Sequence, residues 1–363
     1  MTTAPVRGAT LVGPNRIEIR EYPRPEIRPD GALLAVEAGG VCGTDVKYLH
    51  GTIPLPYPVI LGHEIAGRIV EIGPDARRIH GVAEGDRVIL KGTRGCGHCP
   101  DCRRGSPRFC RRKTNYGGKV SSDRPPHLFG GFADQLYVAP DAVLTPVDEG
   151  VSAEAACLIG SVMANGYQWA VVQGGAHLGD YVLIQGSGQQ GLACTFAAKT
   201  TGAGRIVVTG RSIDADRLRL ARAWGADRTV DVDREDLLEI VREETGGSMA
   251  DVVVDVTGAP EAFATSIRAT RRQGTVVLGG LVGTGVQVPV ELDDLVWSEK
   301  RIQGTYTAGS DALDATLRSV AATGFPVTEM ISHRFPLEET EQCIRAVGRE
   351  IPDLYPVKAV IRP

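Results

Sequence analysis

The spacing of apolar residues divides the chain into two regions that differ in texture. Up to about residue 148, short runs of aliphatic and β-branched residues alternate with Gly and Pro, for example at 32–37, 65–72 and 133–138. Short strands separated in this way predict a compact, barrel-like β domain. A helical pattern follows over 152–173, with Ser152 as its expected N-cap.

Beyond residue 180 the pattern becomes a regular alternation of apolar strands and amphipathic helices. Strands are expected at 181–185, 205–209 and 251–256, and helices at 190–200 and 216–224. Repeated βα units of this length predict a parallel sheet with helices on both faces. After about residue 300 the alternation ends.

Composition narrows the class of protein. The 363 residues are 42% hydrophobic and 23% charged, with a net charge of -4, so the chain offers no basic surface for nucleic acid or an anionic membrane. Neither a signal peptide nor an apolar run of the ~20 residues that a membrane helix needs is evident. Four of the eight cysteines, Cys42, Cys157, Cys194 and Cys343, are scattered without a disulfide-like pairing. A reducing, cytoplasmic location is expected.

One short loop holds the other four cysteines as C-x2-C-x2-C-x7-C, namely Cys96, Cys99, Cys102 and Cys110. Four thiolates at such spacing can surround one tetrahedral Zn²⁺, and the glycines and prolines between them permit the required turns. Two disulfides are the alternative, disfavoured by how the other cysteines are used. A closed four-thiolate site has no open coordination position, so this zinc is predicted to be structural.

A dinucleotide fingerprint follows the first strand of the alternating region. Gly186, Gly188 and Gly191 form G-x-G-x-x-G between an expected strand and an expected helix, the context that makes this motif informative. The glycines allow a tight turn and close approach of the backbone to a pyrophosphate at the helix N-terminus. A glycine turn in another α/β fold is the alternative.

The end of the next strand bears on the choice of cofactor. An NAD-selective site usually carries Asp or Glu there, but this chain has Gly210, followed by Arg211 and Ser212, which can provide charge and a hydrogen bond to a 2′-phosphate. The sequence therefore favours NADP(H) over NAD(H). Asp214 lies close enough to keep NAD(H) open.

Taken together, these motifs resemble the medium-chain, zinc-dependent alcohol dehydrogenase family over nearly the whole chain. The resemblance rests on G-V-C-G-T-D at 40–45, G-H-E at 62–64, G-G-F-A at 130–133, C-L-I-G at 157–160, the cysteine loop and the glycine fingerprint.

The resemblance implies an α/β fold made of a GroES-like β-barrel catalytic domain and a Rossmann domain with a doubly wound parallel sheet. The expected boundaries are 1–155 for the first domain, with a zinc lobe at 92–112, and 156–299 for the Rossmann domain. A return segment at 300–363 would complete the catalytic domain.

The same resemblance implies a catalytic zinc site. Cys42 and His63 match two of the family's ligands, and a thiolate with an imidazole suits Zn²⁺ on chemical grounds. Asp45 matches the carboxylate that orients the imidazole, and Thr44 matches the hydroxyl that contacts the substrate oxygen. In isolation, Cys42 and His63 would be interpreted as ordinary core residues.

Two positions depart from the family pattern. Ser161 stands where many members have the third zinc ligand, and a neutral hydroxyl replaces a thiolate poorly. Three explanations stay open, in this order: Glu64 supplies an oxygen ligand, the catalytic zinc is lost, or Cys157 reaches the metal. The other departure is Lys47, where a His often ends the proton relay; His50 is a second candidate for that role, or a plain loop histidine.

The leading interpretation is a zinc-dependent oxidoreductase that interconverts an alcohol with its aldehyde or ketone by hydride transfer with a nicotinamide cofactor. A family member without catalytic zinc that reduces an activated C=C or iminium bond is the alternative, and a non-catalytic NADP(H)-binding protein is a second. The expected partner is a small-molecule alcohol or carbonyl substrate. The resemblance also implies a homodimer or homotetramer.

Overall fold

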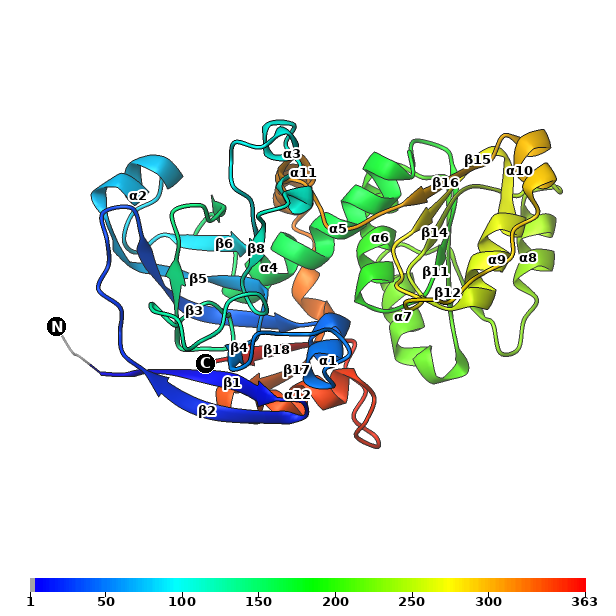
Figure 1. Cartoon of the computed structure of the whole chain (residues 1–363). Coiled ribbons are helices and arrows are strands. Elements are labelled where there is room, and N and C mark those ends of the chain that lie inside the picture. The colour runs from blue at the N-terminus through cyan, green and yellow to red at the C-terminus, as the bar shows by residue number, and fades with distance from the viewer. Residues whose placement is uncertain (1–3) are drawn as a thin grey trace. The chain divides into compact units, whose positions relative to one another are not determined.

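The computed structural model describes residues 4–363, which divide into two compact units (Figure 1). Unit 1 runs through Gly160 and resumes over Pro326–Pro363, and unit 2 is Ser161–Phe325. The sequence had placed the start of the return segment at residue 300. The structure assigns 300–325 to unit 2 because a strand there joins the parallel sheet.

Unit 1 is built mainly from antiparallel strands. Its largest sheet has the order β10 (Leu144–Pro146), β6 (Arg87–Lys91), β5 (Glu64–Ile72), β3 (Ala32–Val41), β18 (Lys358–Arg362) and β17 (Ile331–Pro336), with β9 (Gln135–Val138) also pairing with β3. A second sheet has the order β2 (Arg16–Tyr22), β1 (Val6–Gly13) and β4 (Val59–Ile60), and a two-stranded ladder joins β7 (Thr93–Arg94) to β8 (Thr114–Asn115).

Short helices complete unit 1. They are α1 (Gly43–Leu49), α2 (Pro74–His80), α3 (Pro100–Arg103), α4 (Ala153–Leu158) and α12 (Thr340–Val347), with 3-10 turns at Pro107–Phe109, Val327–Met330 and Leu337–Glu339. Strand β3 is almost entirely buried and contributes to two apolar clusters, one around Leu34 and Ile65 and one around Val41 and Phe132. Burial on both faces explains why its sequence is nearly all apolar.

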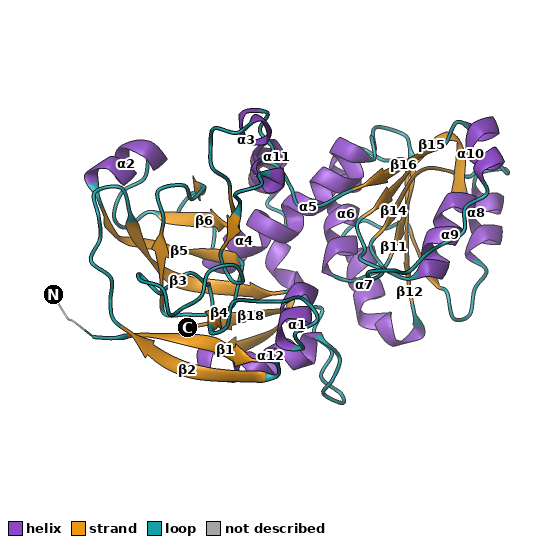
Figure 2. Ribbon diagram, in the orientation of Figure 1, coloured by secondary structure: helices purple, strands orange, loops and turns teal. Residues whose placement is uncertain are grey.

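Unit 2 has a six-stranded parallel sheet in the order β13 (Arg228–Asp231), β12 (Arg205–Gly210), β11 (Tyr181–Gln185), β14 (Ala250–Asp255), β15 (Thr270–Leu278) and β16 (Arg301–Gly304). Its helices are α5 (Ala164–Tyr167), α6 (Gln189–Thr200), α7 (Ala215–Ala223), α8 (Leu237–Glu244), α9 (Pro260–Ala269), α10 (Leu292–Ser298) and α11 (Ser310–Thr323), with a 3-10 turn at Ser212–Asp214. Helices flank this sheet on both sides (Figure 2), as the sequence alternation predicted.

The helical segment predicted at 152–173 is present but is not uniformly α-helical. Ser152 caps it by accepting a hydrogen bond from the Ala155 N–H at 3.2 Å. Two π-helical stretches, Ile159–Met163 and Gln168–Gln173, interrupt the α-helical turns. Among residues 4–363 it is the one helix long and apolar enough to span a membrane, but most of its apolar window is buried inside the protein, as in a core helix.

Candidate active site

The position of Cys42 is fixed by the end of β3 and the start of α1. Cys42 is the N-cap of α1, and its Sγ accepts a hydrogen bond from the Thr44 N–H at 3.3 Å. The Asp45 carboxylate accepts in turn from the Cys42 N–H at 3.0 Å, which closes a capping box. The thiol is therefore held by the same bonds that start the helix.

His63 comes to Cys42 through the antiparallel ladder between β3 and β5. Gly40 pairs with Glu64, so the residue before β5 and the residue after β3 lie at the same end of the two strands. The Nε2 atom of His63 lies 3.1 Å from Cys42 Sγ, and its Nδ1 lies 3.4 Å from Asp45 Oδ1. The imidazole thus has the thiol on one side and a fully buried carboxylate on the other.

The charges around this trio suit a cation. Burial alone would lower the pKa of His63, but the negative charges of Cys42 and Asp45 outweigh it and raise the pKa well above its usual range. The ligand atoms of Cys42, Asp45 and His63 all lie within 4.8 Å of one another. Two ligands on a tetrahedral zinc are separated by about 3.5 Å, given ordinary Zn–S and Zn–N bonds. The donor set of Cys42, Asp45 and His63 therefore fits Zn²⁺.

Glu64 and Cys157 lie beside this trio but have other partners. Lys358 donates a hydrogen bond to Glu64 Oε2, and the two side chains are 0% and 4% exposed. The Cys157 Sγ–H donates to the Glu64 carbonyl oxygen at 3.3 Å, and burial raises the pKa of this thiol to about 12. A Cβ on Gly40 would collide with the Glu64 carboxylate, so a larger residue there would force that side chain to move. The burial of Lys358 was not predicted from the sequence.

The remaining predicted residues of this region lie as follows. Ser161 is in the π-helical stretch at the start of unit 2, whereas Cys42, Asp45 and His63 belong to unit 1. Lys47 is partly buried on α1. His50 follows α1, with Nδ1 2.7 Å from Asn15 Oδ1 and Nε2 2.5 Å from Glu350 Oε1, so both ring nitrogens have partners.

The four loop cysteines converge as predicted. The sulfurs of Cys96, Cys99, Cys102 and Cys110 lie within 4.8 Å of one another, and none of the eight cysteines, all within residues 4–363, forms a disulfide. The Cys99 N–H donates to Cys96 Sγ and the Cys96 N–H to Cys110 Sγ, each at 3.4 Å. These four sulfurs fit the closed tetrahedral zinc site expected from the spacing.

The glycine turn in unit 2 is shaped as a dinucleotide site requires. Gly186 has φ +106°, and a Cβ on Gly191 would collide with the Gly186 carbonyl oxygen. Gly188 begins α6 and faces open space, which leaves room for a pyrophosphate against the backbone. Ser187 Oγ and Gln190 Oε1 are buried without a hydrogen-bond partner among the described residues. A ligand with phosphate and hydroxyl groups would satisfy them.

The end of β12 brings in two residues that the sequence analysis missed. Arg211 Nε donates to Asp233 Oδ1 at 3.2 Å, and Ser212 Oγ donates to Asp231 Oδ2 at 2.6 Å. Gly210 pairs with Asp231 in the parallel ladder. The signal was available, because the carboxyl ends of adjacent parallel strands meet at one edge of a sheet, and Asp231 ends the strand after β12.

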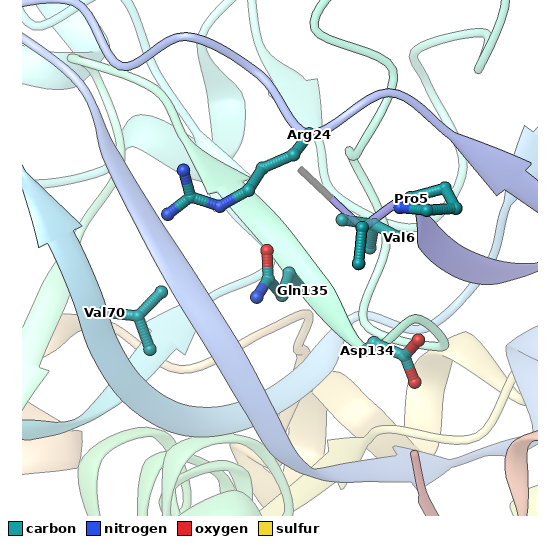
Figure 3. Close-up of a pocket in the computed structure, with 7 residues that line it drawn as sticks. Pro5, Val6, Arg24, Val70, Asp134 and Gln135 are labelled. Atoms are coloured by element: carbon teal, nitrogen blue, oxygen red, sulfur yellow. The ribbon is translucent and has the colours of Figure 1, made fainter. Parts of the chain in front are cut away.

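A hollow of about 350 Å³ in unit 1 lies among Ala4, Pro5, Val6, Arg24, Val70, Asp134 and Gln135 (Figure 3). It contains none of the predicted site residues. Its charged groups already have partners, since Arg24 pairs with Glu71 and Asp134 with Arg7. It adds nothing to the candidate active site.

Comparisons with known proteins agree with this geometry. Residues 28–149 match the alcohol dehydrogenase GroES-like domain, and residues 191–322 match the zinc-binding dehydrogenase domain. The Mycobacterium tuberculosis protein named probable alcohol dehydrogenase is 38% identical over 365 residues, with 99% of both chains covered. An erythritol/L-threitol dehydrogenase of Mycolicibacterium smegmatis is 29% identical, covering 93% of this chain and 92% of its own.

Solved structures give the same answer. A zinc-binding dehydrogenase of Sinorhizobium meliloti bound to NADP has a TM-score of 0.88 at 28% identity and covers 99% of this chain and 100% of its own. The fold class predicted from the sequence is confirmed, and the family supports zinc and a nicotinamide dinucleotide as cofactors. The chain belongs to the medium-chain zinc-dependent alcohol dehydrogenase family and is one of its oxidoreductases.

Proposed function

We propose that this enzyme interconverts a small alcohol and its aldehyde or ketone at a zinc held by Cys42 and His63. The observation that carries the proposal is the packing of the Cys42 thiol and the buried Asp45 carboxylate around the His63 imidazole, with Cys42 Sγ 3.1 Å from His63 Nε2. A structural metal needs four protein ligands, whereas a site with fewer leaves a position for substrate.

When bound, zinc supplies a Lewis acid for the substrate oxygen, and the nicotinamide ring accepts or returns the hydride. Asp45 Oδ1 lies 3.4 Å from His63 Nδ1, and its charge is proposed to orient the ring so that Nε2 faces the metal. Thr44, two residues beyond Cys42 on α1, is the proposed hydroxyl that hydrogen-bonds the substrate oxygen and passes its proton on.

Lys47 is the favoured next group in that proton path. It lies on the same short helix as Thr44 and is partly buried. His50 is less suited, because Asn15 and Glu350 occupy both of its ring nitrogens.

Glu64 is the proposed third zinc ligand in place of Ser161. Its position next to His63 supports this role, but its carboxylate is paired with Lys358, so binding the metal requires it to exchange partners. The same pairing, with Ser161 at the usual ligand position, favours the second candidate function. In that case the enzyme lacks catalytic zinc and reduces an activated C=C or iminium bond.

NADP(H) is the proposed cofactor, preferred over NAD(H). The absence of a carboxylate at Gly210 and the cation and hydroxyl of Arg211 and Ser212 beyond it support this preference. The S. meliloti structure that contains NADP shows that a relative of this fold takes the phosphorylated form.

A homodimer or homotetramer in the cytoplasm is the proposed state of the protein. Strand β16 forms the edge of the unit 2 sheet and is exposed along its length. Leu292, Val296 and Trp297 on α10 are each at least 70% exposed. An unpaired edge strand beside exposed apolar side chains is a typical protein contact surface.

The direct test is turnover by the purified enzyme against panels of primary alcohols, secondary alcohols and polyols with NADP+ or NAD+. A second panel pairs enones and cyclic imines with NADPH or NADH. Oxidation of at least one alcohol class, lost in a Thr44→Val variant, supports the proposal. Reduction of enones or imines without any alcohol oxidation would favour the zinc-free candidate.

A further inference from the structure

The groups predicted to hold a 2′-phosphate are already occupied by carboxylates of the same unit. Arg211 Nε donates to Asp233 Oδ1 at 3.2 Å, and the Ser212 N–H donates to Asp233 Oδ2 at 3.0 Å. Asp233 therefore holds both predicted donor residues at once. The Ser212 N–H, and then the guanidinium of Arg211, lower the pKa of Asp233, so the carboxylate is ionised at neutral pH.

A buried hydroxyl marks this edge of the sheet as a place where a ligand binds. Ser187 is 2% exposed, and its Oγ has no hydrogen-bond partner among the described residues. A Cβ on Gly210 would lie 2.8 Å from that oxygen, so the hydroxyl lies directly beside the end of β12. Ser187 belongs to the glycine turn and lies beside Gly210, so the glycine turn and the Arg211 segment are neighbours.

The charge at this edge is balanced before any cofactor arrives. Arg217 pairs with Asp214 at 3.1 Å, Arg234 lies 3.6 Å from Asp231, and Arg211 pairs with Asp233. A ribose 2′-phosphate adds about 1.5 to 2 negative charges at neutral pH. The phosphate must take Arg211 from Asp233, which leaves that carboxylate uncompensated, or bind without a cation of its own. A free 2′-hydroxyl meets neither cost.

We infer that Asp233 competes with the cofactor's 2′-phosphate for Arg211 and thereby limits the preference of this enzyme for NADP(H) over NAD(H). The inference rests on the proposed function, because it assumes that a nicotinamide dinucleotide binds at the glycine turn. Asp233 is not part of the Gly210–Ser212 segment that predicts the cofactor preference, because it lies 23 residues after Gly210 in a different βα unit. Asp233 is then a specificity-determining residue supplied by the neighbouring strand's loop.

The test is calorimetric titration of the purified protein with NADP+ and with NAD+, without substrate. In Asp233→Asn the Kd for NADP+ should fall about fivefold, the size of one exposed ion pair, while the Kd for NAD+ stays within twofold. Asp216→Asn is the matched control: it removes the same charge, but Asp216 is 78% exposed and pairs with Arg219. It should leave both constants unchanged.

Arg211→Ala completes a double-variant cycle. Arg211→Ala should weaken NADP+ binding. In the Arg211→Ala background, adding Asp233→Asn should no longer increase the affinity for NADP+. An unchanged or weaker affinity of Asp233→Asn for NADP+ would overturn the inference, as would a gain that persists without Arg211. A natural protein that binds neither dinucleotide would overturn the proposed function itself.

Discussion

Lys358, on the last strand, donates a hydrogen bond to Glu64, the residue that follows His63, inside unit 1. The Lys358 ammonium also donates to the Val41 carbonyl oxygen at 2.9 Å, so it ties β18 to the ends of β3 and β5. Burial would lower the pKa of Lys358, but Glu64 and the nearby thiols of Cys42 and Cys157 outweigh it and raise the pKa. The pair links the C-terminal segment to the candidate zinc site.

Replacing Lys358 by Met should destabilise unit 1 strongly, because it leaves the Glu64 carboxylate buried without a cation. Breaking one partner of a buried pair costs about 3–5 kcal/mol. Urea unfolding followed by circular dichroism measures the loss. Lys199→Met, at an exposed lysine on α6, is the control and should change little. Equal stability of the two variants would show that the pair contributes nothing.

Unit 2 has a second ion-pair network that should make its stability depend on pH. Glu244 accepts from Arg205 at 2.6 Å, from Tyr181 at 2.9 Å and from Arg228 at 3.1 Å. The hydrogen bond from Arg205 is the largest cause that lowers the pKa of Glu244 to about 2. The folded pKa lies below the ordinary value, so the stabilisation is complete above pH ~4.5 and is lost as the pH falls toward 2.

The Glu244→Gln variant should therefore be less stable than the natural protein at pH 7, by about 1–2 kcal/mol after allowance for solvent screening. The difference should shrink as the pH falls from about 4.5 toward 3. Thermal midpoints of both proteins across this range measure it. A difference that stays constant with pH would mean that the charge of Glu244 is irrelevant.

The two glycines at the start of α6 should respond differently to alanine. Gly191→Ala pushes a methyl group into the Gly186 carbonyl oxygen, so it should lower the thermal midpoint and weaken dinucleotide binding together. Gly188→Ala meets no atom of the chain, so it should leave stability intact and weaken binding alone. Thermal unfolding and NADP+ titration of both variants separate the two effects. Equal stability losses would argue against this division of roles.

The exposed edge of unit 2 predicts how copies associate. Ile302→Pro removes a backbone donor from β16, and Trp297→Glu places a charge on the α10 face. Each should shift the protein toward monomer in size-exclusion chromatography with light scattering. Val172→Glu, at another exposed apolar residue, is the control. Oligomers unaffected by either change would place the contact elsewhere.

The features that could be predicted from the sequence are those with a repeated pattern, such as the βα units, or with a local motif, such as the cysteine loop. The alternation beyond residue 180 located β11, β12 and β14 to within one residue, because each buried strand is a short apolar run between turn signals. The spacing of the loop cysteines predicted their convergence. Strand β16 was not expected, since its four residues are all exposed and carry no apolar pattern.

The sequence could not predict contacts that form only when distant segments meet. Glu64 and Lys358 are 294 residues apart, and nothing local marks either side chain as buried. The pairing of Arg211 with Asp233 depends on which strand lies beside β12. The π-helical turn containing Ser161 depends on packing rather than on local preference.

Zinc content per chain, measured by mass spectrometry of the metal in purified protein, tests the central claim most directly. The natural protein should hold two zinc ions, Cys42→Ala should hold one with alcohol oxidation abolished, and Cys102→Ser should hold one with reduced thermal stability. One zinc in the natural protein, unchanged in Cys42→Ala, would contradict a catalytic metal at Cys42 and His63.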